Sequence, residues 1–361
     1  MKAHFEKIFK PEVRKIQPYT LPKFAAEVKL DQNENPHGFP PALKAAFWAR
    51  LQEKDWARYP AYDATSVRAT LAQKLSLPKE QLLVANGSNA LIQSLLMVII
   101  SSGDSIIIPQ PTFSLYKTTV QLLSGQAAEV MLNPTDFSLP VEHVLEQAHR
   151  LRAKAVILCS PNNPTGVAYS RDQIVDILEN FDGLVVVDEA YVEFSDQDLL
   201  PLLQPHDRLV LLRTLSKAYA MAGCRVGYML AHPEIIREVS KAFVPYCISI
   251  FAEAAALVAL DHQRELDEHI LRLQQERERL YTTLQQLSGV TVFPSAANFF
   301  LLRFECEARE VFDGLLEQKI LVRDVSHYPM LENCLRVSVG SPAENQRFLA
   351  ALKPWSGAIV S

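Results

Sequence analysis

The 361-residue chain has few cysteines and no large excess of charge of either sign. Its cysteines are odd in number, scattered and never spaced as a CxxC pair: Cys159, Cys224, Cys247, Cys306 and Cys334. That usage argues against a disulfide framework and a zinc site, and it fits a reducing compartment. With 36 basic and 41 acidic residues the formal net charge is −5, which argues against a general nucleic-acid or anionic-membrane binder.

Long hydrophobic runs are also missing. The most apolar early run, residues 90–100, is too short to span a bilayer. The first six residues, MKAHFE, lack the apolar core of a signal peptide, so we expect a cytoplasmic protein. Hydrophobic residues make up 48% and charged residues 21%, an ordinary globular composition. The length predicts two domains, or one large domain with a satellite.

Short apolar runs recur between about residues 60 and 250, with helical stretches between them. They are apolar at successive rather than alternate positions, which is typical of strands buried on both faces of a parallel sheet. The runs are 82–84, 105–108, 155–159, 184–187, 208–212 and 226–230. We therefore predict an α/β fold, with a mostly parallel sheet covered by helices on both faces.

The rest of the chain predicts a smaller α/β domain and a connection to it. Residues 252–287 contain one glycine-free and proline-free amphipathic stretch, which we expect to be a single long helix. We expect strands at 292, 298–304, 320–323 and 335–339, and helices at 307–318 and 342–352. The predicted division is 1–45 as an N-terminal arm and part of the small domain, 46–287 as the large cofactor-binding domain ending in the long helix, and 288–361 as the small domain.

A lysine with unusual neighbours follows the expected strand at 208–212. Desolvation readily lowers the pKa of a lysine, and the neutral amine can form an imine with an aldehyde. Small hydroxyls and an arginine near Lys217, namely Thr214, Ser216 and Arg225, could hold a phosphate. An exposed loop lysine would leave those three neighbours unexplained.

Asp188 ends another expected strand. A carboxylate there is costly unless it is paired, and a protonated pyridine nitrogen is one such partner. Tyr191, three residues on, could reach the same ligand. A plain cap of the next element is the alternative for Asp188.

Three further strand ends carry polar or aromatic residues. Gly87, Ser88 and Asn89 open a helix whose N–H groups could bind phosphate, although the motif taken alone favours an ordinary helix cap. Asn163 lies in a turn with two prolines and could direct its amide at a ligand oxygen, or simply form the turn. Tyr116 could stack on a flat ring, or pack in the core. Together these residues match what pyridoxal phosphate requires.

With these motifs the chain resembles the aspartate-aminotransferase superfamily of pyridoxal-phosphate enzymes, fold type I. Within it, the chain most resembles the histidinol-phosphate aminotransferase subgroup. The matching segments are 33–36, 58–60, 161–166, 188–191, 215–227, 322–324 and 331–337, so the resemblance spans nearly the whole length.

The resemblance implies roles for individual residues. Lys217 would form the imine with the cofactor and Asp188 would pair with its ring nitrogen. Asn163 and Tyr191 would contact the phenolic oxygen, and Tyr116 would stack on the ring. The phosphate would be held by Gly87, Ser88, Asn89, Thr214, Ser216 and Arg225.

The resemblance also implies how substrate is bound. Arg336 would bind the substrate carboxylate and Arg323 the anionic tail. Tyr19 and Tyr59 would lie near the substrate, with Tyr59 reaching the partner's site in a homodimer. Relatives often carry an acidic residue at position 89, so the role of Asn89 stays open, as do those of His37 and His327.

The expected activity is transamination between histidinol phosphate and 2-oxoglutarate, in histidine biosynthesis. The alternatives are an aromatic amino-acid aminotransferase, a threonine-phosphate decarboxylase, and a non-catalytic regulator that retains the fold. An intact Lys217 with Asp188 argues against the regulator.

Overall fold

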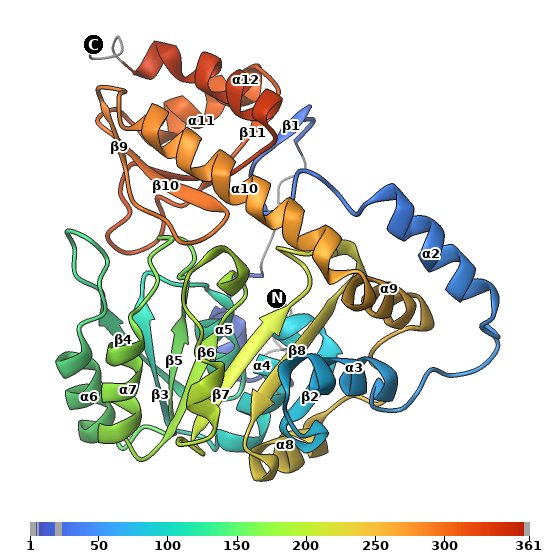
Figure 1. Cartoon of the computed structure of the whole chain (residues 1–361). Coiled ribbons are helices and arrows are strands. Elements are labelled where there is room, and N and C mark those ends of the chain that lie inside the picture. Colours follow the sequence, from blue (N-terminus) through green and yellow to red (C-terminus); the bar gives the residue numbers. More distant parts are fainter. Residues whose placement is uncertain (1–4, 6, 19–23, 357–361) are drawn as a thin grey trace.

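A seven-stranded sheet forms the centre of the larger part of the molecule (Figure 1). The computed structural model describes residues 5, 7–18 and 24–356. The strand order is β2-β8-β7-β6-β5-β3-β4. The bounds are β2 (Leu82–Asn86), β3 (Ser105–Gln110), β4 (Gln126–Met131), β5 (Ala155–Cys159), β6 (Leu184–Asp188), β7 (Leu209–Thr214) and β8 (Val226–Ala231).

Neighbouring strands from β4 to β7 are parallel, and β8 is antiparallel to both of its neighbours. The predicted mostly parallel sheet is therefore confirmed. The sequence pattern did not reveal β4, because this edge strand has only Val130 fully buried and lacks the continuous apolar run of the central strands.

Helices cover both faces of this sheet. One face carries α4 (Gly87–Ile99), α5 (Leu115–Leu122) and α8 (Pro233–Val239), and the other carries α6 (Val141–Arg150), α7 (Arg171–Asn180), α3 (Thr65–Leu75) and α9 (Ile250–Asp261). Successive strand residues enter opposite cores: Val185 and Val187 belong to one hydrophobic cluster and Val186 to the other. Burial on both sides explains why these strands are apolar throughout.

A second, four-stranded antiparallel sheet lies above the first in Figure 1, with the order β12-β13-β10-β9. Its strands are β9 (Val290–Val292), β10 (Phe299–Phe304), β12 (Arg323–Asp324) and β13 (Cys334–Ser338), and α11 (Ala308–Glu317) and α12 (Pro342–Leu352) accompany them. Near the start of the chain, β1 (Val28–Lys29) pairs in parallel with β11 (Ile320–Leu321). The N-terminal segment therefore joins this smaller part.

The connection between the two parts differs from the prediction of one long helix. The structure has two helices, α9 and α10 (Gln263–Leu284), separated at His262. Almost every residue of α9 is apolar and most are buried, whereas α10 buries a single stripe that includes Leu266, Leu273 and Leu280. The single-helix prediction was wrong, because no glycine or proline marks the boundary at residue 262. Two helices near the start are α1 (Pro11–Lys15) and α2 (Pro41–Gln52), the latter packed on α9.

Within the described ranges, none of the helices combines the length and the apolar character that crossing a membrane requires.

Candidate active site

The predicted cofactor-binding residues meet at one edge of the large sheet. Strands β2, β3, β5, β6 and β7 point in the same direction, so their carboxyl ends share that edge. Strand β8 runs the opposite way and begins there, directly after Arg225. Ligands of open parallel sheets bind outside the carboxyl ends of the strands. We call the predicted site residues at this edge the strand-end site.

Lys217 follows β7 and is partly buried in the strand-end site. Its Nζ donates to the carbonyl oxygen of Gln32 at 2.7 Å. Burial, and then the positive charge of Arg336, lower the pKa of Lys217 to about 8. Near neutral pH part of the population is therefore a free amine, which is the form that attacks a carbonyl or accepts a proton.

Asp188 ends β6 and is only 3% exposed. Its Oδ2 accepts from the Tyr116 hydroxyl at 2.8 Å, and its Oδ1 accepts from the Ala190 N–H at 3.1 Å. Burial raises the pKa of Asp188 to about 6 despite these two hydrogen bonds. A cation placed beside this carboxylate would be strongly favoured, since it would offset the cost of burying the charge.

The structure contradicts the stacking role expected for Tyr116. Its ring is completely buried in the core beneath α5, and its hydroxyl is bonded to Asp188, so no ring face is open to a ligand. Phe113, which sequence reasoning missed, lies three residues beyond β3 and is only partly buried. The sequence does contain a signal for Phe113, because the Pro-Thr-Phe turn places an aromatic residue shortly after the end of a strand.

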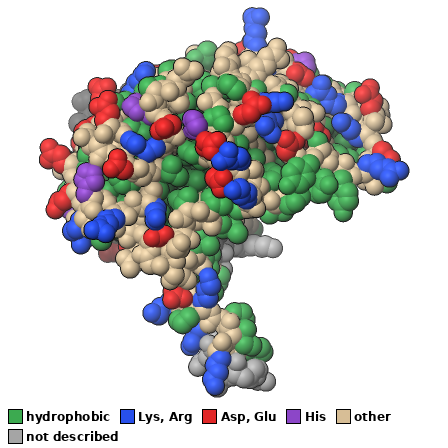
Figure 2. All heavy atoms as spheres, turned by 90° about the horizontal axis from the view of Figure 1, so that it is seen from below, with side chains coloured by type: hydrophobic (Ala, Val, Ile, Leu, Met, Phe, Trp, Pro, Cys, Tyr) green, Lys and Arg blue, Asp and Glu red, His purple; other side chains and the backbone are tan. Residues whose placement is uncertain are grey.

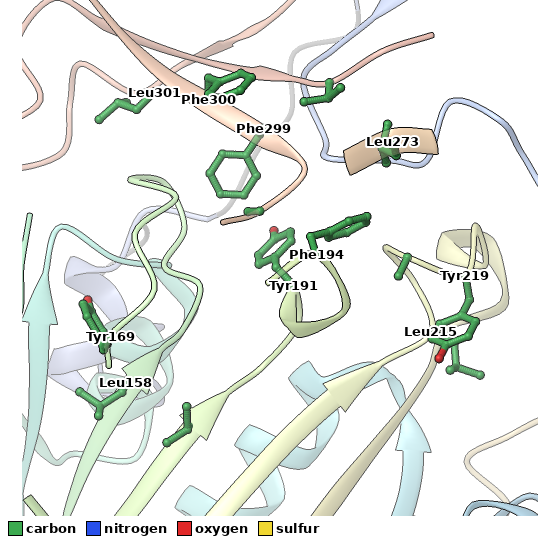
Figure 3. Packing of buried hydrophobic residues seen from close by; sticks show 14 of the residues in the cluster. Leu158, Tyr169, Tyr191, Phe194, Leu215, Tyr219, Leu273, Phe299, Phe300 and Leu301 are labelled. Atoms are coloured by element: carbon green, nitrogen blue, oxygen red, sulfur yellow. The ribbon is translucent and has the colours of Figure 1, made fainter. Parts of the chain in front are cut away.

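Tyr191 and Asn163 are brought together as expected. The Tyr191 hydroxyl accepts from Asn163 Nδ2 at 3.3 Å and from Asn33 Nδ2 at 3.0 Å. Figure 3 shows Tyr191 below Phe299 of β10, with ring centroids 5.2 Å apart at 78°. The strand-end site therefore lies where the large sheet faces the smaller one. Asn33 was missed as a site residue. It belongs to the Asn-Glu-Asn-Pro segment and has a left-handed backbone conformation (φ 53°).

A polar cup forms around the start of α4. Arg225 Nη1 donates to Ser216 Oγ at 3.2 Å, and Thr214 Oγ1 donates to the same oxygen at 2.9 Å. A Cβ at Gly87 would lie 2.5 Å from Arg225 Nη2, so glycine lets the guanidinium approach the helix start. Free helix N–H groups, two hydroxyls and a guanidinium suit a dianionic phosphate. Ser88 is buried in the same first turn, and Asn89 is partly buried.

Gly227 in β8 keeps the cup in place, because a Cβ there would lie 2.4 Å from the backbone nitrogen of Ser88. We predict that Gly227→Ala displaces the start of α4 and weakens cofactor binding by about tenfold or more, as expected when one or two charge-assisted hydrogen bonds are lost. Titration of the apoenzyme with pyridoxal phosphate measures this. Gly223→Ala is the matched control, since a Cβ at Gly223 meets no atom within 4 Å. Equal affinity in the two variants would contradict the prediction.

The two predicted substrate arginines converge on Asp31. Arg336 donates from Nη2 to the Asp31 carbonyl at 2.5 Å and from Nη1 to Asn163 Oδ1 at 2.7 Å. Arg323 Nε lies 3.4 Å from the same carbonyl oxygen, and its Nη2 lies 3.8 Å from Asp31 Oδ2. Gln32, the next residue, accepts from Lys217 Nζ, so residues 31–32 link both arginines to the lysine, and the charge of Arg336 acts on the lysine directly.

Other predicted residues lie elsewhere. Tyr59 is 82% exposed and stacks on Tyr246, with ring centroids 4.7 Å apart. Tyr19 lies outside the described residues. The ring of His37 packs against that of His269 in α10, with ring centroids 5.5 Å apart. The rings of His327 and Tyr328 have centroids 4.5 Å apart. These contacts give neither histidine a role in the strand-end site.

Comparison with known proteins gives consistent results. The family model described as aminotransferase class I and II matches residues 25–352. A histidinol-phosphate aminotransferase of Chlorobaculum parvum is 36% identical over 355 residues, covering 98% of this chain and 99% of the relative. One of Chlorobaculum tepidum is 38% identical over 329 residues, covering 91% and 94%.

Solved structures show the same fold. The histidinol-phosphate aminotransferase of Sinorhizobium meliloti, in complex with pyridoxal-5'-phosphate, superposes with a TM-score of 0.86 at 25% identity, covering 95% of this chain and 96% of the other. The L-threonine-O-3-phosphate decarboxylase of Porphyromonas gingivalis has a TM-score of 0.79 at 27% identity, covering 90% and 98%.

Proposed function

The chain belongs to the class I and II aminotransferase family, and from this premise we propose that it is a pyridoxal-phosphate-dependent histidinol-phosphate aminotransferase. It transfers the amino group of histidinol phosphate to 2-oxoglutarate, giving imidazole acetol phosphate and glutamate in L-histidine biosynthesis. The observation that carries the proposal is the position of Lys217, on which the charges of both Arg225, in the polar cup, and Arg336 act.

The residues of the strand-end site fit the cofactor. Because Gly87 has no Cβ, the Arg225 guanidinium lies close to the start of α4, and we assign the phosphate group to Gly87, Ser88, Asn89, Thr214, Ser216 and Arg225. Asp188 would pair with the ring nitrogen, Asn163 and Tyr191 would bind the phenolic oxygen, and Phe113, in place of Tyr116, would lie against the ring. When bound, pyridoxal phosphate supplies an aldehyde for imine formation with Lys217 and a ring that takes up the electron pair left by proton removal.

Lys217 is the general base and acid of the reaction. Its pKa of about 8 leaves a neutral amine available, and this amine takes a proton from the substrate Cα and later returns one. The Gln32 carbonyl restrains Nζ at 2.7 Å, which limits the positions from which the amine can act.

Two arginines let one site accept two substrates of different shape. A guanidinium binds carboxylate or phosphate through two parallel hydrogen bonds. Arg336, already oriented by Asn163, binds the carboxylate of glutamate or 2-oxoglutarate. Arg323, held loosely by Asp31, binds the phosphate of histidinol phosphate.

We predict that Arg323→Ala raises the KM for a phosphorylated amine by about tenfold or more, because a charge-assisted hydrogen bond is lost. The KM for an aromatic amino acid should change much less. Steady-state kinetics with histidinol phosphate and phenylalanine measure both. Arg303→Ala is a suitable control, since that guanidinium donates to the Met330 carbonyl instead. Equal effects of Arg323→Ala on both substrates would exclude Arg323 as the phosphate partner.

A second activity has a specific observation in its favour. The decarboxylase of phosphorylated threonine shares the fold and would also need a cationic partner for a phosphate. In that reaction Cα loses carbon dioxide rather than a proton. Release of carbon dioxide from a phosphorylated amino acid would separate it from amino transfer.

We also propose that the enzyme is a cytoplasmic homodimer. Exposed aromatic side chains are grouped in sequence at Trp56, Tyr59 and Tyr62 and again at Tyr246 and Phe251, and these two groups contact each other. Figure 2 shows apolar side chains gathered in patches between charged ones on the face it presents. A second copy would cover these rings and bring Tyr59 to its partner's site. The five free thiols support the compartment.

We propose a separate role for each domain. The large domain, residues 46–287, holds the cofactor. Residues 288–361 form the small domain and contribute Arg323 and Arg336. Residues 1–45 form the arm, and their Asp31–Asn33 segment joins the two halves of the site.

A further inference from the structure

Tyr116 is a fully buried residue that directly contacts the proposed partner of the cofactor ring. It lies on α5, and its ring packs edge-on against Phe113, with centroids 5.6 Å apart at 84°. Its hydroxyl donates to Asp188 Oδ2 at 2.8 Å. Because the ring is enclosed by the core between α5 and the sheet, the hydroxyl is held at a fixed point beside the carboxylate.

The Tyr116 hydroxyl keeps its proton near neutral pH. Burial, followed by the negative charge of Asp188, raises the pKa of Tyr116 well above its usual value. The neighbouring Cys159 has a pKa raised to about 12, mainly by burial, and its thiol donates to the Pro161 carbonyl at 3.4 Å. Asp188 is thus the one group of the three that changes charge near neutral pH.

We propose that Tyr116 is a positioning residue, which holds the Asp188 carboxylate ionised and oriented toward the ring nitrogen of the cofactor. This inference rests on the proposed function only in requiring pyridoxal phosphate as the ligand. The physical reason is that burial alone favours the protonated acid, whereas a hydroxyl donor favours the carboxylate. With Oδ1 fixed by the Ala190 N–H and Oδ2 by Tyr116, the carboxylate plane is set from both sides.

Tyr116→Phe tests this proposal because it retains the packed ring and removes only the hydroxyl. Tyr169→Phe is the matched control: Tyr169 is also fully buried in the large domain, yet its oxygen has no contact with Asp188 among the described hydrogen bonds. Fluorescence titration of each apoenzyme with pyridoxal phosphate gives the dissociation constant. We expect a rise of about tenfold in Tyr116→Phe, the effect of losing one hydrogen bond to a charged group, and less than about twofold in Tyr169→Phe.

A cofactor analogue separates positioning from packing. The 1-deaza analogue of pyridoxal phosphate has a carbon in place of the ring nitrogen and cannot pair with Asp188. If Tyr116 acts through that pairing, Tyr116→Phe weakens pyridoxal phosphate but leaves the affinity of the analogue nearly unchanged. A merely structural role weakens both ligands equally and would overturn the proposal.

The pH dependence gives an independent readout. Loss of the hydroxyl donor raises the pKa of Asp188 further, so the carboxylate is lost at a higher pH as the solution is acidified. The acid limb of the cofactor affinity should therefore move to higher pH in Tyr116→Phe and stay in place in Tyr169→Phe. Identical profiles for both variants and the wild type would overturn the proposal. Turnover of histidinol phosphate is not needed for these titrations, so a failure of the proposed substrate would show separately, in the wild-type assay.

Discussion

Replacing Lys217 by alanine abolishes transamination while pyridoxal phosphate still binds. The variant loses both the amine that forms the imine and the base that moves the Cα proton, and we expect kcat to fall by about 10⁴-fold or more. The phosphate cup around Arg225 and Ser216 is untouched, so the cofactor is retained noncovalently. Stopped-flow and steady-state assays of glutamate formation measure the loss, and equilibrium dialysis measures the retained cofactor.

Lys154→Ala is the control for this experiment, because Lys154 is an exposed lysine at the amino end of β5. It should keep wild-type activity. Transamination at a normal rate in Lys217→Ala would remove the basis of the assignment.

The second large effect is expected from Asp188→Asn. The amide retains the shape of the carboxylate, but it has no charge with which to stabilise a protonated ring nitrogen. We expect kcat to fall by about 10²- to 10³-fold, comparable with the removal of one preorganised electrostatic group from other active sites. Asp182→Asn, at the exposed amino end of the same strand, is the matched control. Steady-state kcat for the two variants decides the matter, and wild-type turnover in Asp188→Asn would contradict a role in ring protonation.

The strand ends were predictable from sequence because each depends on local chemistry. A buried parallel strand is apolar at every position, so a polar residue such as Asp188 or Thr214 directly after it is conspicuous. The edge strand β4 lacks that pattern, since one of its faces is exposed. The break at His262 also lacks a local signal, because the two adjoining helices differ in burial but have no glycine or proline between them.

Contacts between distant segments could not be derived in the same way. Asn33 meets Tyr191 across 158 positions of sequence, and Asp31 meets Arg336 across 305. No periodicity or turn signal records such a pairing. The same limit explains the Tyr116 error: sequence placed an aromatic ring at the right strand end, but only tertiary packing decides whether Tyr116 or Phe113 is buried.

The Asp31–Asn33 segment also explains how the two halves of the site are coupled. Its backbone carbonyls hold Arg336 and Lys217, and the Asn33 amide holds Tyr191. One short segment near the start of the chain thus contacts residues from the middle of the chain and a residue near its end. A change in this segment would therefore disturb proton transfer and substrate binding together.

The most direct test of the central claim is a substrate panel on the purified wild-type enzyme. Glutamate formation from 2-oxoglutarate is measured with histidinol phosphate, phenylalanine and tyrosine as amino donors. The account predicts that kcat/KM is highest for histidinol phosphate, and that double-reciprocal plots at several 2-oxoglutarate concentrations are parallel, as alternate half-reactions require. Efficient glutamate formation from phenylalanine or tyrosine, with none from histidinol phosphate, would contradict it.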